Sequence, residues 1–138
     1  GTKSVGPKTQ PFHTLNPALA HLSDGRVMSY GTMGGEGQPQ TQSAIFTRHV
    51  QFGMDLQAAV TAPRWLLGKT WGDDTATLKL EKRFDAEVIA ALKSVGNKVE
   101  MLPEFSDLTG HAGALVLHPN GLVETATDPR ADGAALSL

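Results

Sequence analysis

The chain has 138 residues, of which 40% are hydrophobic and 19% are charged, and its formal net charge is -2. This composition excludes an intrinsically disordered chain and fits one globular domain. No run of Lys and Arg is long enough to follow a phosphate backbone, and no apolar stretch approaches the ~18 residues of a membrane helix. We therefore expect neither nucleic acid nor a membrane as a partner. The lack of Cys removes disulfides, thiolate metal sites and a cysteine nucleophile.

The first 31 residues predict an extended segment followed by a β-hairpin. Gly and Pro breakers make residues 1–10 an extended N-terminal segment. Residues 17–22 and 26–31 have the composition of strands, and they flank a short turn at residues 23–25. Gly25 can adopt a positive φ in this turn, so the two strands are expected to pair.

Residues 38–52 and 55–62 predict two helices. Apolar side chains recur at helical spacing in the first segment, and Pro39 suits a first helical turn. Asp55 can cap the second helix through its side chain. Pro63 ends this helix because proline lacks the N–H donor that a helix requires.

The middle of the chain predicts a loop, a strand and a third helix. Residues 65–74 are expected to form the loop. Residues 75–81 alternate polar and apolar side chains, which is typical of a half-buried strand whose polar face contacts water. Asp85 is expected to cap a helix with one apolar stripe, and Gly96 is expected to end it in a left-handed conformation.

The last third of the chain predicts three strands. Residues 98–102 read as a strand that Pro103 stops. Residues 112–117 are apolar on both faces, which is typical of a central buried strand. A turn at residues 119–121 then leads into a strand at residues 122–126. The resulting order, ββααβαβββ, predicts an α+β domain in which helices cover the sheet faces.

Four glycines within residues 31–37 form the strongest candidate site. They lie between a predicted strand and the start of a predicted helix, where backbone N–H groups can point at an anion or a developing oxyanion. The segment lacks the Gly-Lys-Ser/Thr of a phosphate loop and the spacing of a dinucleotide-binding loop. From these residues alone, an oxyanion site and a plain turn both remain open.

Other polar residues give weaker evidence for a functional site. His13 and Thr14 lie between two prolines in a loop, where they can hydrogen-bond a ligand or cap a turn. Residues 73–74, both Asp, are read as solvated loop charge, and Asp128 with Arg130 as an ion pair or a turn cap. No metal site is expected because the remaining histidines lack ligand spacing; they are His21, His49, His111 and His118. No G-x-S-x-G elbow or activated nucleophile is present, so spacing alone reveals no complete active site.

Four short motifs occur in a characteristic order along the chain. They are Val-Gly-Pro-Lys-Thr-Gln-Pro-Phe-His-Thr-Leu-Asn-Pro at residues 5–17, Gly-Thr-Met-Gly-Gly at 31–35, Ala-Pro-Arg at 62–64 and Asp-Pro-Arg at 128–130. In this order and approximate spacing they resemble the γ-glutamyltransferase family, also called γ-glutamyltranspeptidases or glutathione hydrolases. The resemblance extends from residue 5 to the C-terminal end.

The resemblance implies an N-terminal-nucleophile hydrolase with a four-layer αββα fold, made as a precursor that cuts itself into a large and a small subunit. Residues 1–138 resemble the C-terminal part of the small subunit and form a single domain. In the family, a threonine freed at the N-terminus of the small subunit attacks the γ-glutamyl carbonyl, and its own α-amino group acts as base. We expect that threonine to precede this chain. Thr2 lies too close to the motif at residues 5–17, and Lys-Ser-Val follows it in place of the histidine-containing signature expected after the nucleophile. The chain alone is expected to be inactive.

The same resemblance assigns the candidate site residues. Gly34 and Gly35 match the paired glycines whose N–H groups form the oxyanion hole. His13 and Thr14 occupy the positions at which typical transpeptidases have two serines that bind the glutamyl α-carboxylate. This departure is similar to the cephalosporin-acylase-like branch, so recognition of other acyl groups is expected beside γ-glutamyl.

The leading hypothesis is an enzyme that hydrolyses or transfers a γ-glutamyl or other acyl group from an amide such as glutathione, without a cofactor. Its expected partners are a small-molecule substrate, the large subunit, the N-terminal part of the small subunit, and further copies of this chain. Arg64 and Arg130 are expected to hold the fold. The alternative is a non-catalytic module that binds a small ligand with the glycine loop. The compartment, bacterial-type periplasmic or cytoplasmic, stays open.

Overall fold

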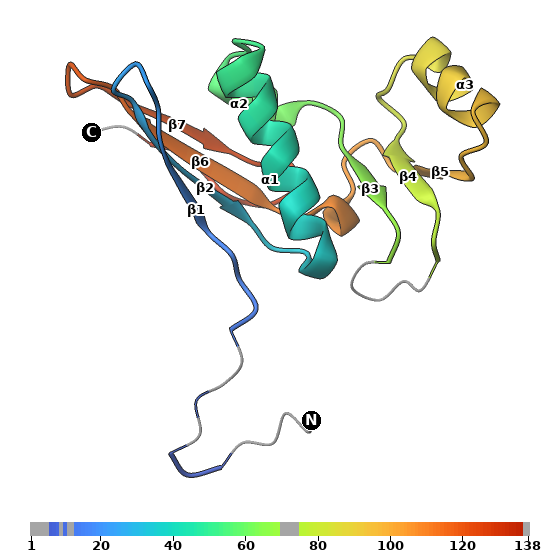
Figure 1. The fold of residues 1–138 in the computed structure, drawn as a ribbon, viewed down its shortest axis with the longest axis horizontal. Helices are drawn as coiled ribbons and strands as arrows, with labels where there is room; N and C mark the ends of the chain where they lie inside the picture. Colours follow the sequence, from blue (N-terminus) through green and yellow to red (C-terminus); the bar gives the residue numbers. More distant parts are fainter. Residues whose placement is uncertain (1–5, 9, 11–12, 70–74, 137–138) are drawn as a thin grey trace.

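The computed structural model describes residues 6–8, 10, 13–69 and 75–136, and these residues form two sheets and three α-helices (Figure 1). The larger sheet is antiparallel and has the order β1-β2-β6-β7, and the smaller has the order β3-β4-β5. The strands are β1 Ala18–His21, β2 Val27–Thr32, β3 Trp65–Leu67, β4 Leu78–Glu81, β5 Val99–Leu102, β6 Ala112–Leu117 and β7 Val123–Thr127. The α-helices are α1 Gln38–Phe46, α2 Leu56–Thr61 and α3 Ala86–Ser94. Of the segment expected to be extended, residues 1–5 and 9 lie outside the described residues.

The predicted hairpin and both predicted helices are confirmed. Strands β1 and β2 pair antiparallel, and Gly25 closes their turn with a φ of 86°. Helix α1 has Pro39 in its first turn and continues into a π-helical turn over Thr47–Gln51. The Asp55 carboxylate accepts a hydrogen bond of 2.9 Å from the amide of Ala58, so it caps α2 as expected.

The apolar core lies between the larger sheet and the helices α1 and α2. Met28 of β2, Ile45 of α1 and Val116 of β6 are almost fully buried in it, together with Leu56 and Val60 of α2. Figure 1 shows both helices on the same face of this sheet. Burial of these side chains supplies the hydrophobic stabilisation that fixes α1, and with it the turn that precedes α1.

The prediction of a loop at residues 65–74 is wrong for residues 65–67. Trp65–Leu67 forms strand β3, which pairs antiparallel with β4, with Trp65 opposite Leu80. Three residues are too few to show an alternating pattern, so tertiary pairing and not local sequence makes this strand. Residues 70–74, including the Asp pair, lie outside the described residues.

The strand expected at residues 75–81 is present as β4, but the prediction that its polar face contacts water is wrong. The side chains of Lys79 and Glu81 are completely buried. The physical reason is that Glu81 pairs with the buried Arg130 from a distant part of the chain, and Lys79 donates to the Gly68 and Thr75 carbonyls. Strand β4 then runs parallel to β5 after the crossover helix α3.

Helix α3 is confirmed, but its expected cap is not observed. Asp85 makes no capping hydrogen bond through its side chain, and no residue of α3 is buried. Val88 and Val95 are 42% and 76% exposed. Gly96 does end the helix with the expected positive φ, at 93°. The apolar stripe therefore has little cover within the described residues.

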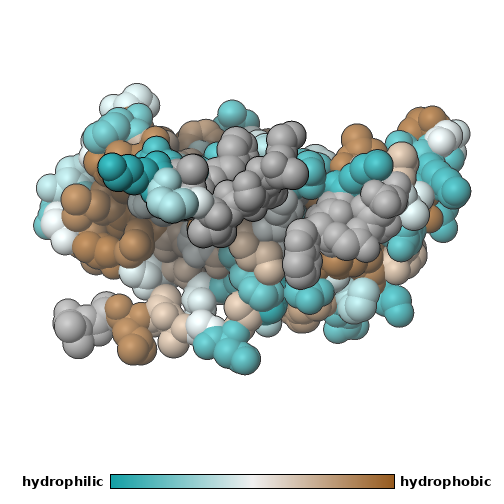
Figure 2. Space-filling view, turned by 90° about the horizontal axis from the view of Figure 1, so that it is seen from below, coloured by the Kyte–Doolittle hydropathy of each residue, from teal (hydrophilic) through white to brown (hydrophobic). Residues whose placement is uncertain are grey.

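Strand β6 is central, as predicted, but only one of its faces is buried. Its residues alternate between buried and exposed, and Leu115 and Leu117 are each 48% exposed. The helices cover one face of the sheet, and the other face is open within the described part of the chain (Figure 1). Hydrophobic side chains gather at the end of the molecule where this sheet lies (Figure 2). The turn at Gly121 and the following strand β7 are as predicted.

Candidate functional site

The glycine turn connects β2 to α1. Gly34 has a φ of 124° and Gly35 a φ of 53°, conformations that L side chains rarely adopt. A single 3-10 turn over Gly35–Gly37 follows, in which the Gly37 amide donates to the Gly34 carbonyl at 2.9 Å, and α1 begins directly after it. The turn thus lies at the positive end of a helix, where N–H groups favour negative charge.

Gly110, from the segment before β6, packs on this glycine turn. A Cβ placed on Gly34 would lie 3.5 Å from the Cα of Gly110. Gly110 itself has a φ of 87°, and a Cβ on it would collide with the Met33 carbonyl oxygen and the Thr32 hydroxyl. The backbone at Gly110 therefore approaches the turn as closely as the absence of a side chain allows. The sequence motifs did not single out this residue.

The loop with His13 and Thr14 lies beside the glycine turn because Gln38 joins the two. The buried Gln38 side chain donates to the Thr14 carbonyl at 2.8 Å and accepts from the Asn16 amide at 3.1 Å. Its Nε2 also lies 3.3 Å from the Gly35 carbonyl oxygen. The His13 and Thr14 side chains are exposed. The structure thus brings together the two segments that the sequence predicted as a site.

Gln38 is a further residue of the candidate site, and the sequence analysis missed it. A second glutamine one helical turn later, Gln42, donates to the Asn16 carbonyl at 2.7 Å. The available signal was the pair itself, since two amides four residues apart share one helix face directly after the glycine turn.

A small cavity of about 310 Å³ opens beside the site. The Nε2 atom of His111 is buried and has no hydrogen-bond partner in the described structure. The residues that line the cavity come from the His13 loop, the end of β2 and the segment before β6: Leu15, Pro17, Gly31, Thr32, Met33 and His111.

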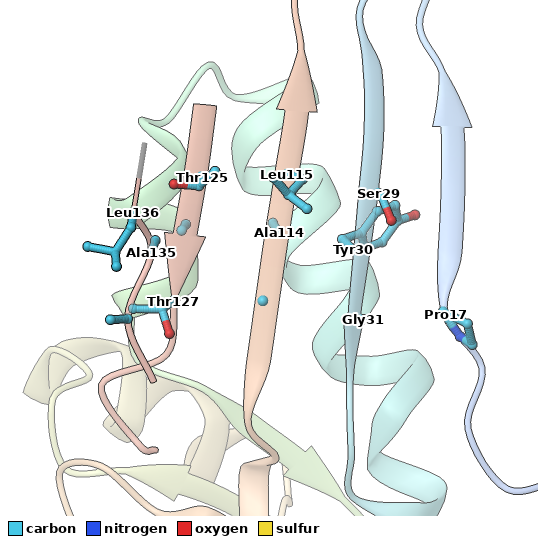
Figure 3. Close-up of a pocket in the computed structure, with 13 residues that line it drawn as sticks. Pro17, Ser29, Tyr30, Gly31, Ala114, Leu115, Thr125, Thr127, Ala135 and Leu136 are labelled. Atoms are coloured by element: carbon cyan, nitrogen blue, oxygen red, sulfur yellow. The ribbon is translucent and has the colours of Figure 1, made fainter. Parts of the chain in front are cut away.

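A larger hollow of about 500 Å³ lies on the open face of the larger sheet (Figure 3). Ser29, Leu115 and Thr125 occupy paired positions on three adjacent strands there. Figure 3 shows these side chains on the side of the sheet away from α1 and α2. No Asp, Glu, His, Lys or Arg lines this hollow among the described residues, so it has the character of an uncovered packing surface.

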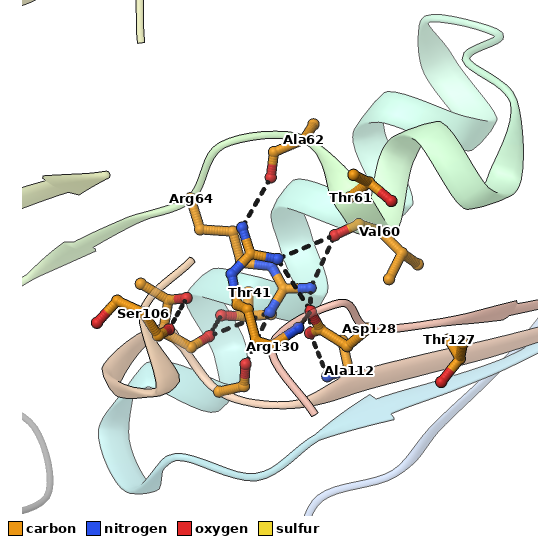
Figure 4. A network of polar contacts seen from close by, with 12 residues as sticks. Thr41, Val60, Thr61, Ala62, Arg64, Ser106, Ala112, Thr127, Asp128 and Arg130 are labelled. Atoms are coloured by element: carbon orange, nitrogen blue, oxygen red, sulfur yellow. Dashed lines mark hydrogen bonds and ion pairs between the residues drawn. The ribbon is translucent and has the colours of Figure 1, made fainter. Parts of the chain in front are cut away.

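A buried network of charges includes Arg64, Asp128 and Arg130 (Figure 4). Arg64 pairs with Asp128 at 2.6 Å, and both side chains are 1% exposed. The Arg64 guanidinium also donates to the Gly110 carbonyl at 2.9 Å and to the Val60 carbonyl at 2.9 Å. Asp128 accepts a hydrogen bond of 2.7 Å from the amide of Ala112.

The second half of the network is centred on Glu81. Arg130 contacts it through Nη2 at 2.5 Å and through Nε at 2.7 Å, and Arg83 contacts it at 3.1 Å. Arg130 also pairs with Asp128 at 3.0 Å, so the expected Asp128–Arg130 ion pair is present. The amide of Ser106 donates to Glu81 at 3.0 Å. Both carboxylates are therefore matched by charged or amide donors.

The network keeps its charges at neutral pH. Burial lowers the pKa of Arg64 to about 10, and Asp128 opposes that shift. Burial alone would raise the pKa of Asp128, but Arg64 and the backbone amides bring it below its usual value. Burial likewise opposes ionisation of Glu81, but the hydrogen bonds from Arg130 and from the Ser106 and Arg64 amides together outweigh it, so the pKa of Glu81 is also lowered. The paired arginines and carboxylates thus stabilise one another inside the fold.

Metal chemistry has no ligand set in the part of the chain that the structure describes. No three or more His, Asp or Glu side chains gather there in a way that could hold an ion. His49 is occupied by the Met54 carbonyl at 2.9 Å and by Arg26 at 3.2 Å, and His118 by Glu124 at 3.2 Å. Nor is any helix among the described residues long and apolar enough to span a bilayer.

Residues 2–138 match the family model described as gamma-glutamyltranspeptidase. The oxamate amidohydrolase proenzyme of Klebsiella pneumoniae is 60% identical over 132 residues, covering 96% of this chain and 25% of that protein. The glutathione hydrolase-like YwrD proenzyme of Bacillus subtilis is 42% identical over 135 residues, covering 98% of this chain and 26% of that protein. The chain thus spans about a quarter of the length of these curated relatives.

Solved structures share the fold of this chain. The transpeptidase CapD of Bacillus anthracis shares the fold with a TM-score of 0.75 at 20% identity, covering 99% of this chain and 78% of that one. A cephalosporin acylase from Bacillus halodurans gives a TM-score of 0.66 at 29% identity, covering 77% of this chain and 19% of that one. The predicted α+β class and its likeness to N-terminal-nucleophile hydrolases are confirmed. Because the family model matches residues 2–138, nearly the whole of this chain, the chain belongs to the γ-glutamyltranspeptidase family.

Proposed function

We propose that this chain is the C-terminal part of the small subunit of an amide-cleaving enzyme, which hydrolyses or transfers an acyl group. The nucleophile of the proposal is an N-terminal threonine on the preceding part of a precursor. The observation that carries the proposal is the glycine turn, which lies at the start of α1 and is joined to the His13 loop by Gln38. A strand, a helix start and a candidate substrate loop meet at this point.

The proposed chemical role of Gly34 and Gly35 is to donate N–H hydrogen bonds to the oxyanion. Attack on an amide carbonyl turns its oxygen into an oxyanion, and backbone donors held in place stabilise this charge. Loss of one such donor costs about 10²–10³ in kcat in other enzymes. The positive φ values of both glycines support a turn that is held in one unusual conformation.

The proposed substrate is a small amide that carries a carboxylate. The relative with 60% identity is an oxamate amidohydrolase, and oxamate combines an amide with a carboxylate. His13 and Thr14 stand where two serines would bind a glutamyl carboxylate, and an imidazole with a hydroxyl can bind an anion in a different shape. The small cavity beside Met33 and His111 also suits a short acyl group. We therefore place oxamate-like amides ahead of glutathione.

The proposed partner of the open sheet face is the rest of the precursor. Leu19, Leu115, Leu117 and Val123 expose roughly half of their side chains or more on the larger sheet. Contiguous apolar surface of this kind favours a packing partner. In the proposed protein, a second layer of the same subunit covers this face.

Expression of the full-length protein tests the proposal. We expect mass spectrometry to show self-cleavage into two subunits, with threonine at the new N-terminus, and we expect release of ammonia from oxamate to exceed cleavage of glutathione. The matched control replaces that threonine with alanine, which should abolish both activities. An uncleaved protein that binds a small ligand without turnover would favour the alternative of a binding module and contradict the enzyme.

A further inference from the structure

We propose that Arg64, together with Asp128, is a positioning residue for amide cleavage: the pair fixes the backbone of residues 110–112 and thereby the direction of the N–H groups in the glycine turn. This inference rests on the proposed function of the turn. It assigns Arg64 a role beyond holding the fold, and it separates Arg64 from the other buried arginines.

Arg64 and Asp128 hydrogen-bond the backbone at the two ends of residues 110–112. The Arg64 Nη1 atom donates to the Gly110 carbonyl at 2.9 Å, and the Asp128 Oδ2 atom accepts from the Ala112 amide at 2.7 Å. The two side chains are themselves joined at 2.6 Å and are almost completely buried. Because charged hydrogen bonds out of water are strong and directional, this segment has little freedom to move.

Gly110 packs against the glycine turn, so restraint of Gly110 also restrains the turn. Its backbone lies so close to Met33 and Thr32 that a side chain would not fit, and its Cα would touch a Cβ added to Gly34. The Thr32 hydroxyl donates to the Met33 carbonyl at 2.8 Å on the same side. Close-packed groups have no space to absorb a displacement, so a shift of Gly110 must move the turn.

The same segment also holds the helix that follows the turn. The Thr41 hydroxyl of α1 donates to the Thr109 carbonyl at 2.8 Å, and both residues are buried. The turn is therefore fixed at both ends, by Gly110 at its start and by Thr109 through α1 at its end. Oxyanion donors require placement of this accuracy, because their value depends on being aligned before the charge develops.

Arg83 offers a matched comparison within the same network. It contacts Glu81 at 3.1 Å and donates to the Glu104 and Thr61 carbonyls at 2.7 Å each. It thus has a guanidinium in the same network, but its contacts lie on the Glu81 side and not on residues 110–112. Loss of Arg83 should lower stability without moving the turn.

The test compares Arg64→Lys with Arg83→Lys in the full-length enzyme, using the amide that the wild type cleaves best. A lysine keeps the charge but cannot bond the Gly110 carbonyl, the Val60 carbonyl and Asp128 with one rigid fork. We expect Arg64→Lys to lower kcat about tenfold or more with KM changed less than about threefold, the pattern of a transition-state defect. Arg83→Lys should keep kcat within about twofold at a similar loss of melting temperature.

A second variant tests the positioning role even if Arg64→Lys does not fold. Gly110→Ala leaves the ion pair in place and pushes on Met33, so it should reproduce the fall in kcat. Folded Arg64→Lys or Gly110→Ala with wild-type kcat would overturn the positioning role. A wild-type enzyme that cleaves no amide would overturn the proposed function instead, so the two failures are distinguishable.

Discussion

The protein has two interiors of opposite character. Between the larger sheet and the helices α1 and α2, the buried side chains are apolar, as Met28, Ile45 and Val116 show. On the face of β4 that carries Glu81, the interior contains charged side chains, and Glu81 contacts two arginines. Apolar packing depends on volume and tolerates small shifts, whereas charged hydrogen bonds fix atoms in particular directions. The ionic interior is the one that hydrogen-bonds Gly110, the residue packed on the glycine turn.

The largest expected effect comes from breaking the ionic interior. Asp128→Ala leaves two buried arginines without one of their carboxylates, and we expect a loss of about 3–5 kcal/mol in the free energy of unfolding. Ile45→Val in the apolar interior should cost about 0.5–1.5 kcal/mol. Urea denaturation of the 138-residue chain measures both. A smaller loss for Asp128→Ala than for Ile45→Val would show that the network contributes little.

Acid should weaken the ionic interior and spare the apolar one. The pKa values of Asp128 and Glu81 are lowered in the folded protein from 3.8 and 4.5, so their contribution to stability is complete above about pH 4.5. That contribution is lost as the pH falls through the lower folded values, because the unfolded chain then binds more protons.

Melting temperature recorded from pH 7 to pH 3 tests this expectation. The wild type should lose stability steeply below about pH 4.5, and Glu81→Gln should start lower and fall less steeply. Ile45→Val serves as the control, since it should be displaced from the wild type by a constant amount. Equal slopes for the wild type and Glu81→Gln would contradict a charged Glu81 in the folded state.

The smallest effect on stability is expected on the open face of the larger sheet. Leu115→Ser with Leu117→Ser should change the free energy of unfolding by about 1 kcal/mol or less per site, because both side chains are already about half exposed. The same double variant should reduce self-association of the isolated chain, which light scattering measures. A wild-type chain that stays a monodisperse monomer at high concentration would argue against this face as a packing surface.

The apolar interior was predictable from the sequence, and the ionic one was not. Apolar side chains, including Ile45, recur at helical spacing, and strands β1 and β2 flank a recognisable turn. Local pattern and tertiary packing therefore agree in this interior. In β4, Lys79 and Glu81 alternate with leucines as they would in a half-exposed strand. The burial of Glu81 depends on the Arg64 amide and the Arg130 guanidinium, which lie 17 and 49 residues away in the chain and which no local period reveals.

The candidate site divides in the same way. Its glycine turn and the His13 loop carry short motifs, so the resemblance to a family located them. Gln38 and Gly110 carry none, since one acts by a side chain that reaches back over the turn and the other by the absence of a side chain. Their roles follow from contacts between segments far apart in sequence, which only the folded chain shows.

The most direct test of the account is kcat for Gly34→Ala in the full-length enzyme. Proline would break this turn outright, because it cannot adopt the φ of 124° at Gly34, so alanine is the milder probe. Gly121→Ala is the matched control, with a positive φ of 85° in a turn where a Cβ meets open space. We predict that Gly34→Ala lowers kcat at least about tenfold with little change in KM, while Gly121→Ala keeps the wild-type kcat. A folded Gly34→Ala enzyme with wild-type kcat would contradict the oxyanion role and leave the glycine segment a plain turn.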